Sequence, residues 1–177
     1  NVESFSKLVQ DPSVDVIVWG VRGYPNAIRN PKMFGWIDAK EGEVHSISVK
    51  APLDKPGSDP IVLGTFTFRR ADDFRRALDR LIARNGQVNG EFYIDSLIND
   101  AIALGLNCRL FEVDSYLCWG TPNDLRTFEY WQSCLHKWSA HPYRLERDKR
   151  IPPKSIMELQ LRYREITPNA PELKDLL

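Results

Sequence analysis

The pattern of apolar and polar positions predicts a chain in which strands and helices are mixed. Runs typical of strands cover residues 14–19, 33–38, 44–49, 61–68, 108–113 and 116–119. The second and third runs surround the acidic turn Glu41-Gly42, and this order predicts a β-hairpin. Because strands and helices do not alternate strictly, we expect an α/β fold with a mixed sheet flanked by helices.

Apolar residues at helical spacing predict the helices. They recur over residues 2–10, 71–83, 92–104 and 155–164. A further helix is expected after Thr121, which can cap it, because Pro122 and Asp124 suit a first helical turn. Residues 22–32 and 51–60 are polar and contain prolines, so both segments are expected to be loops.

The composition changes at about residue 139. From Ser139 onward the chain is richer in proline and carries the mixed-charge run RLERDKR. We therefore expect a main domain over residues 1–138. Residues 139–177 are expected to form an appendage that is extended apart from one short helix.

Charge and composition exclude several classes of protein. The 177 residues include 24 Lys and Arg and 24 Asp and Glu, so the formal net charge is zero. A balanced charge argues against nonspecific binding to nucleic acid, and no apolar run is long enough to cross a bilayer. The N-terminal residues do not look like a signal peptide, and the three cysteines have no paired spacing. These features predict a cytoplasmic protein without nucleic-acid or membrane partners.

Two strand glycines and one strand-end lysine are candidate binding residues. Gly35 and Gly64 interrupt apolar strands, where a glycine marks either a bulge or tight packing, or a place where a ligand approaches the backbone. Lys50 ends the run SISVK, where it could meet an anionic group such as phosphate or could simply be solvated.

Acidic residues offer a second set of candidates. Glu91 and Asp95 are four residues apart at the start of a predicted helix, so they can share a face. They could hold a hydroxylated ligand or a metal ion, or they could favour the helix dipole. Asp114 lies between two predicted strands, where a turn aspartate is the default reading.

The junction Trp119-Gly120-Thr121 joins a predicted strand to a helix. Backbone N–H groups at such junctions bind anions or sugar hydroxyls, although many junctions are only connections. Cys118 beside it could be a reactive thiol or a small packed residue.

Three segments carry a family resemblance when they are taken together. They are NPKMFGWIDAKEGEVHSISVKAPL (30–53), IVLGTFTFRRADDF (61–74) and NGEFYIDSLINDAIALGLNCRLFEVDSYLCWGTPNDL (89–125). In this order and spacing they resemble the C-terminal half of the sugar-1-phosphate nucleotidyltransferases, which have a Rossmann-like, glycosyltransferase-A-like fold. The resemblance implies transfer of a nucleotidyl group from an NTP to a sugar 1-phosphate with Mg²⁺, which releases pyrophosphate and makes a nucleotide sugar.

The same resemblance implies roles for single positions. Gly35 resembles the glycine that lies against the sugar, and Lys50 resembles the lysine that holds the sugar phosphate. Gly64 and Thr65 resemble a strand segment at the sugar hydroxyls. The acceptor-pocket segment corresponds to Glu91, Tyr93 and Asp95, and the turn beside the metal corresponds to Trp119, Gly120 and Thr121.

Two departures from the family pattern shape the expectation. The Gly-rich loop that cradles the NTP and the first metal-binding aspartate are absent from the sequence. The chain therefore looks truncated, is expected to be inactive alone, and could self-associate into a homo-oligomer through exposed apolar surface. A non-catalytic sugar-phosphate-binding or regulatory module is the alternative.

The second departure concerns the metal. Cys118 stands where many relatives carry a metal-binding aspartate, and a thiol is a poor ligand for Mg²⁺. Asp114 or Asp95 would have to take its place.

Overall fold

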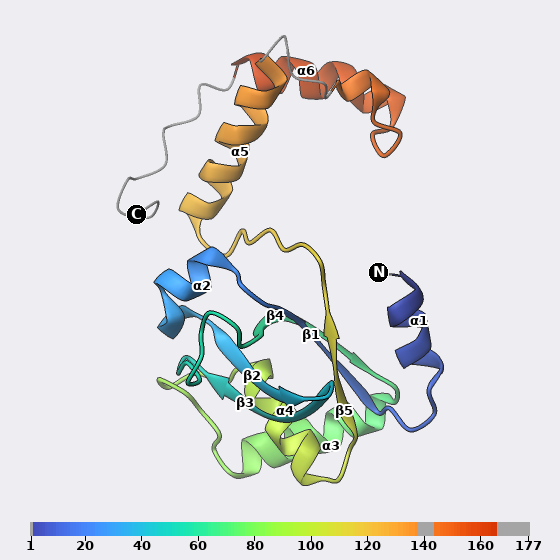
Figure 1. Cartoon of the computed structure of the whole chain (residues 1–177), viewed down its shortest axis with the longest axis vertical. Coiled ribbons are helices and arrows are strands. Elements are labelled where there is room, and N and C mark those ends of the chain that lie inside the picture. Colours follow the sequence, from blue (N-terminus) through green and yellow to red (C-terminus); the bar gives the residue numbers. More distant parts are fainter. Residues whose placement is uncertain (1, 138–143, 166–177) are drawn as a thin grey trace. The chain divides into compact units, whose positions relative to one another are not determined.

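The computed structural model describes residues 2–137 and 144–165, which fall into two compact units (Figure 1). The units are Asn1–Tyr116 and Leu117–Leu177. This division lies earlier than the boundary expected after residue 138, so the helix that follows Thr121 belongs to the second unit. Part of the expected appendage lies outside the described residues.

The first unit is built on five strands. They are β1 (Val16–Val21), β2 (Gly35–Lys40), β3 (Glu43–Val49), β4 (Ile61–Phe68) and β5 (Cys108–Glu112). The strand order is β1-β4-β2-β3-β5, and β5 pairs back with β1, so the sheet closes. The β1–β5 pair is parallel, whereas the other neighbours are antiparallel. This mixed sheet confirms the predicted α/β class.

Helices cover the sheet on more than one side (Figure 1). The first unit contains α1 (Val2–Gln10), α2 (Pro25–Arg29), α3 (Ala71–Ala83) and α4 (Ile94–Ala103). Residues of every strand pack with α3 and α4 in the main core, which includes Val16, Ile37 and Ile47 from the strands and Leu81, Leu97 and Ile98 from the two helices. On another side, α1 packs Phe5 against Trp19 and Phe111, with ring centroids 5.0 and 5.4 Å apart.

A side-chain amide fixes α4 on strand β3. Asn99 accepts a hydrogen bond from the backbone N–H of Ile47 at 2.7 Å and donates one to its carbonyl at 2.8 Å. The amide therefore satisfies both backbone groups of a strand residue, as a neighbouring strand would. This contact sets the position of the α4 N-terminal turn relative to the end of β3.

Turns and local elements follow the sequence with two exceptions. The hairpin β2–β3 turns at Glu41 and Gly42 with φ angles of 54° and 79°, a left-handed geometry that suits a two-residue hairpin turn. The segment 22–32, expected to be a loop, contains helix α2, which begins with Pro25 at its first position. The strand expected over 116–119 is wrong, because those residues pair with no strand.

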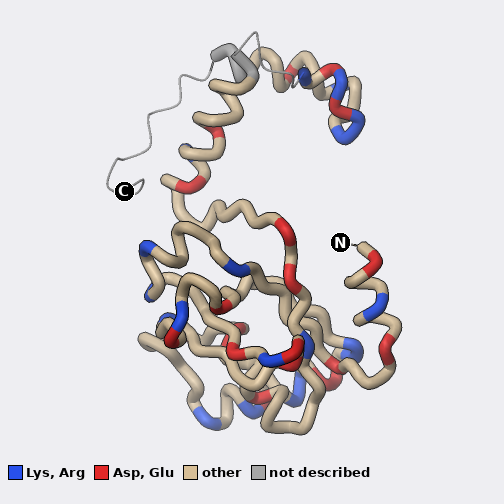
Figure 2. The backbone as a smooth tube through the Cα atoms, viewed as in Figure 1, with Lys and Arg blue, Asp and Glu red and all other residues tan. Residues whose placement is uncertain are grey.

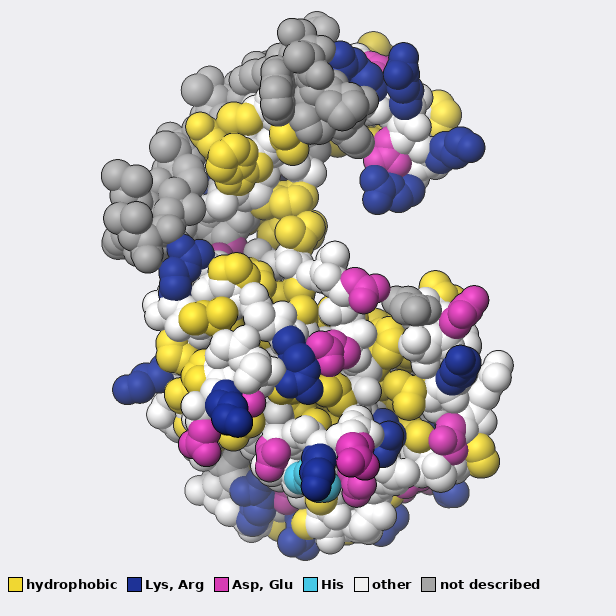
Figure 3. Space-filling model, in the orientation of Figure 1, with side chains coloured by type: hydrophobic (Ala, Val, Ile, Leu, Met, Phe, Trp, Pro, Cys, Tyr) yellow, Lys and Arg dark blue, Asp and Glu magenta, His cyan; other side chains and the backbone are white. Residues whose placement is uncertain are grey.

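The second unit contains α5 (Pro122–Lys137) and α6 (Ile156–Glu165). Arg162 on α6 donates a hydrogen bond to Glu129 on α5 at 2.9 Å, which joins the two helices. Apolar side chains appear on the surface over α5 in Figure 3, where Leu125 and Trp131 are 41% and 57% exposed. Self-association through such a surface stays a prediction.

Charges are interspersed along the described backbone rather than gathered by sign (Figure 2). None of the helices in the described ranges is long and apolar enough to cross a membrane.

Candidate functional site

Lys50 lies at the end of β3 in an unusual backbone conformation. Its φ angle is 59°, in the left-handed region that non-glycine residues rarely adopt. The backbone N–H of Lys50 donates to the Phe34 carbonyl at 3.1 Å, and its ammonium donates to the Met33 carbonyl at 2.6 Å. Two consecutive carbonyls of the chain leading into β2 therefore hold this half-buried lysine.

Tyr93 approaches the same lysine from the segment before α4, and Glu91 binds the hydroxyl of Tyr93. The Lys50 ammonium lies 5.6 Å from the centre of the Tyr93 ring, within the range of a cation–π contact. The Tyr93 hydroxyl donates to the Glu91 carboxylate at 2.6 Å, and this hydrogen bond raises the pKa of the Tyr93 phenol. A tight turn at Asn89-Gly90 brings Glu91 into place, since Val88 and Glu91 exchange backbone hydrogen bonds of 2.9 and 3.1 Å.

Asp95 completes the cluster from the first turn of α4. Its carboxylate lies against Gly35, where an added Cβ atom would be 2.5 Å from Asp95 Oδ2. Burial raises the pKa of the Asp95 carboxyl, while the charge of Lys50 and a backbone hydrogen bond oppose that shift. Only glycine at position 35 leaves room for this carboxylate, so the strand and the helix are complementary at this point.

Five of the predicted site residues therefore meet in one place. They come from the start of β2, the end of β3 and the segment leading into α4, and they are Gly35, Lys50, Glu91, Tyr93 and Asp95. We call this group the Lys50 cluster. The Lys50 ammonium lies beside the Asp95 carboxylate, and the Glu91 carboxylate is bound to the Tyr93 hydroxyl. An ammonium can bind an anion, and carboxylates can accept hydrogen bonds from the hydroxyls of a polar molecule.

Gly64 lies in a bulge of strand β4. Between the pairs Val18–Phe66 and Gly20–Val62, β4 has three residues where β1 has one. Gly64 has a φ of 75°, and the bulge leaves both Gly64 and Thr65 exposed. The bulge explains the glycine structurally, and a sugar contact at Gly64 and Thr65 stays a prediction. Val62, two residues earlier, lies beside Gly35.

The junction Trp119-Gly120-Thr121 lies in the second unit, where it caps helix α5. The Thr121 hydroxyl accepts a hydrogen bond from the Asp124 N–H at 3.1 Å, as predicted for a cap. Asp124 in turn accepts the Thr121 N–H at 2.9 Å, and the Gly120 N–H points at the Cys118 sulfur at 3.3 Å. Both N–H groups expected to meet a ligand are thus hydrogen-bonded within the junction. The Trp119 side chain is 58% exposed and packs on Phe128.

The residues proposed as metal ligands do not assemble a metal site. Across residues 2–137 and 144–165, no three His, Cys, Asp or Glu side chains gather as ion ligands would. Asp114 is exposed after β5, while Asp95 has the Lys50 charge beside it. A hard cation such as Mg²⁺ prefers several oxygen ligands, so these residues do not fit the ion by themselves.

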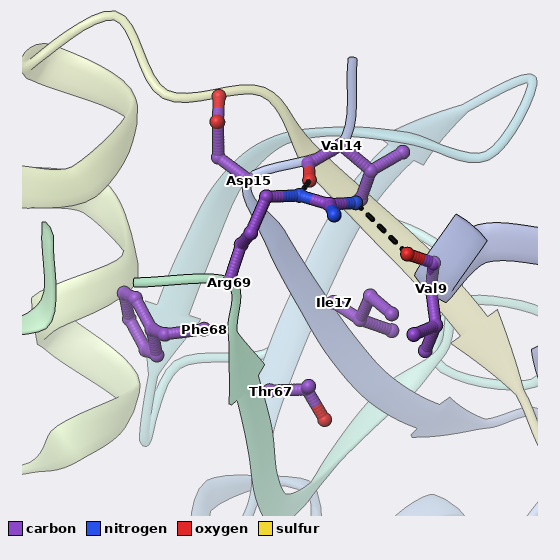
Figure 4. Close-up of a pocket in the computed structure, with 7 residues that line it drawn as sticks. All are labelled: Val9, Val14, Asp15, Ile17, Thr67, Phe68 and Arg69. Atoms are coloured by element: carbon purple, nitrogen blue, oxygen red, sulfur yellow. Dashed lines mark hydrogen bonds between the residues drawn. The ribbon is translucent and has the colours of Figure 1, made fainter. Parts of the chain in front are cut away.

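A separate hollow of about 220 Å³ lies between α1 and strands β1 and β4 (Figure 4). Its charged residue Arg69 donates from Nε to the Val14 carbonyl at 2.6 Å and from a terminal nitrogen to the Val9 carbonyl at 3.0 Å. Asp15, also at its edge, accepts the backbone N–H of Asn107 at 2.9 Å. Arg69 therefore holds the end of α1, and Asp15 holds the segment before β5, so both polar groups have structural roles.

The sequence did not reveal the groups that hold Lys50. Met33 and Phe34 act through backbone carbonyls, which every residue carries, so no residue type could mark them. The chain order SISVK predicted a lysine at a strand end but not its left-handed conformation.

Several solved structures are similar to this chain, and two of them are described next. One is a nucleoside-diphosphate-sugar pyrophosphorylase from Vibrio cholerae RC9, with a TM-score of 0.52 and 23% identity over 65% of this chain and 46% of that one. The other is a CMP:2-keto-3-deoxy-manno-octonic acid synthetase complexed with CTP, with a TM-score of 0.46 and 17% identity over 72% of this chain and 53% of that one. No protein-family model and no curated protein matches the sequence.

The first likeness shows that the chain has a nucleotidyltransferase-like fold over the aligned share. At 23% identity it shows the fold alone. The chain spans less than half of the length of that pyrophosphorylase.

Proposed function

We propose that the Lys50 cluster is the acceptor site of a nucleotidyltransferase that couples an NTP to a sugar 1-phosphate. Pyrophosphate leaves in this reaction, and a nucleotide sugar is formed. The observation that carries the proposal is that Gly35 at the start of β2, Lys50 at the end of β3 and residues 91–95 before and in α4 meet in one place. The similarity of the fold to a nucleoside-diphosphate-sugar pyrophosphorylase supports it.

Each residue of the cluster has a role in this proposal. The Lys50 ammonium binds the acceptor phosphate as a point charge, because its three donors suit the oxygens of a phosphate. Gly35 has no side chain, which leaves room for the Asp95 carboxylate beside the start of β2. The carboxylates of Asp95 and Glu91 accept hydrogen bonds from sugar hydroxyls.

These groups position the acceptor rather than transform it. Phosphoryl-group transfer depends mainly on alignment and on neutralisation of charge, with little covalent work by the protein. Holding the phosphate at Lys50 and the sugar at Asp95 would aim one phosphate oxygen at the incoming nucleotide. The metal ion that such reactions use would supply charge neutralisation, but the described residues offer it no complete site, so no step here depends on it.

Nuclear magnetic resonance can locate the site directly. We expect α-D-glucose 1-phosphate, or another sugar 1-phosphate of a small panel, to shift the backbone amide signals of Gly35, Lys50 and residues 91–95. Amides at the hollow beside α1, such as that of Thr67, serve as an internal control and should not shift. Binding that shifts only signals outside the Lys50 cluster would contradict the proposal.

An activity assay separates this enzyme from the alternative, a sugar-phosphate-binding or regulatory module. Pyrophosphate release is measured with an NTP, Mg²⁺ and the sugar 1-phosphate that binds. Turnover supports the transferase. Binding at the Lys50 cluster without turnover in the full-length protein supports the module, whereas this chain alone is expected to be inactive in either case.

A further inference from the structure

We infer that Tyr93 is a positioning residue that holds the Lys50 ammonium ready for an anionic ligand, with Glu91 fixing the ring. The inference deepens the proposed function and rests on it. The distances that carry it are 5.6 Å from the ammonium to the ring centre and 2.6 Å from the Tyr93 hydroxyl to the Glu91 carboxylate.

A lysine side chain needs such support because it has four rotatable bonds. Ordering it on ligand binding costs conformational entropy, which weakens the affinity. In this structure the ammonium already lies between the Met33 carbonyl and the face of the Tyr93 ring. Much of its freedom is therefore lost before any ligand arrives.

The ring is suited to hold a cation without blocking its use. An ammonium has three hydrogen-bond donors, and the Met33 carbonyl accepts one of them. The attraction between a cation and an aromatic face acts through the charge and the ring quadrupole rather than through one hydrogen bond. Donors thus remain for phosphate oxygens while the ring restrains the side chain.

Glu91 determines where the ring lies. The phenol of Tyr93 donates to its carboxylate, which ties the far end of the ring to the turn at Asn89-Gly90. The Tyr93 side chain makes no capping hydrogen bond to α4, although Tyr93 is the residue that precedes that helix. Shortening the side chain should therefore leave the helix intact.

A double-mutant cycle tests the inference by calorimetry with α-D-glucose 1-phosphate. Tyr93→Leu removes the aromatic face and should weaken binding about two- to fivefold, the range of an exposed cation–π contact. Tyr93→Phe keeps the aromatic face but loses the hydrogen bond to Glu91 that fixes the ring, so it should recover only part of that loss. Phe92→Leu is the matched control, since Phe92 is a neighbouring aromatic residue that is 47% exposed, and it should bind like the parent.

The cycle is completed in a Lys50→Met background. If Tyr93 acts through the lysine, Tyr93→Leu should have no further effect once the charge is gone. In the parent, the ε-methylene protons of Lys50 should show an upfield ring-current shift that Tyr93→Leu abolishes and Phe92→Leu retains.

The outcomes separate this inference from the proposed function. If Lys50→Met weakens binding tenfold or more but Tyr93→Leu binds like the parent, the positioning role is wrong and the acceptor site stands. The positioning role is also wrong if Tyr93→Leu lowers the affinity equally in the parent and in the Lys50→Met background. If neither α-D-glucose 1-phosphate nor inorganic phosphate binds at the cluster, the proposed function fails and this inference fails with it.

Discussion

Gly35 and Asp95 are in such close contact that a single methyl group would not fit between them. A Cβ atom at position 35 would lie 2.5 Å from Asp95 Oδ2 and 3.3 Å from a methyl carbon of Val62. The contact joins the first residue of β2 to the first turn of α4, and it places a half-buried carboxylate beside Lys50.

Gly35→Ala should displace the Asp95 carboxylate and weaken the site. Because the displaced atom is the end of a side chain, we expect a modest loss of about 1 kcal/mol in the free energy of unfolding. Affinity for a sugar 1-phosphate should fall about fivefold, the value of one hydrogen bond. Urea denaturation and calorimetry measure the two effects.

Gly57→Ala is the matched control for this change. No atom lies within 4 Å of a Cβ atom added at Gly57. The free energy of unfolding of Gly57→Ala should stay within about 0.5 kcal/mol of that of the parent. Equal behaviour of the two variants would show that the Gly35–Asp95 contact has no role.

Asp95 should titrate above the usual aspartate value of 3.8, because burial disfavours its charged form. When folding raises the pKa of a carboxyl, the free energy of unfolding falls as the pH rises from the pKa of the unfolded state through that of the folded state. Asp95→Asn should therefore gain stability relative to the parent across that pH range and keep the gain at neutral pH. Below pH 3.8 the two proteins should converge.

The Lys50 charge works in the opposite direction. Lys50→Met removes a charge that favours the ionised form, so the pKa of Asp95 should rise further. Carboxyl carbon chemical shifts followed against pH report both values. A pKa of Asp95 below 3.8, or one unmoved by Lys50→Met, would be inconsistent with this electrostatic environment.

Asp100 is a structural carboxylate, and its ion pair should matter more than those on the surface. Its side chain is 3% exposed and accepts two hydrogen bonds of 2.7 Å from Arg84, which ties α4 to the end of α3. Arg84→Met leaves this buried charge with only the longer contact to Arg80 at 3.4 Å. We expect a loss of about 3 kcal/mol in thermal or urea unfolding.

The exposed pair of Arg75 and Asp72 is the control for that prediction. These side chains are 73% and 67% exposed, so Arg75→Met should cost less than about 0.5 kcal/mol. Similar losses from the two arginine variants would mean that the burial of Asp100 does not determine how much its ion pair contributes to the free energy of unfolding.

Cys118→Asp tests whether position 118 can be a metal position. The Cys118 sulfur is 4.0 Å from Asp124 Oδ2, so the new carboxylate would lie near an existing one. Repulsion should lower the stability by about 1 kcal/mol without a divalent ion, and Mg²⁺ should restore it by bridging the two carboxylates. Thermal melts with and without Mg²⁺ measure this, with Cys118→Ser as the control. A loss that Mg²⁺ does not reduce would rule out a metal role for this position.

Periodicity predicted most of the fold. The helix over 71–83, the strand over 61–68 and the hairpin around Glu41-Gly42 all form where the pattern placed them. Each is a local pattern in which burial of one face or a turn residue decides the outcome. The strand prediction over 116–119 was wrong. It rested on the apolar residues of this segment, but Leu117 and Trp119 are 68% and 58% exposed and have no partner strand.

The sequence predicted less of the site than of the fold. Lys50, Glu91 and Asp95 stood out as charged residues beside predicted elements, but their meeting depends on how β3 and α4 pack. That packing is set by the amide of Asn99, which bonds to both backbone groups of Ile47. The closure of the sheet through the parallel β1–β5 pair is likewise a tertiary property that no local pattern carries.

The most direct test of the account is the affinity of Lys50→Ala for α-D-glucose 1-phosphate, measured by calorimetry beside the parent. A hydrogen bond to a charged group is worth roughly 1.5–3 kcal/mol, so binding should weaken about ten- to over a hundredfold. Lys40→Ala, which removes an exposed lysine at the other end of β2, should bind like the parent. If Lys50→Ala binds within about twofold of the parent, the Lys50 ammonium does not hold the phosphate and the acceptor site is not at this cluster.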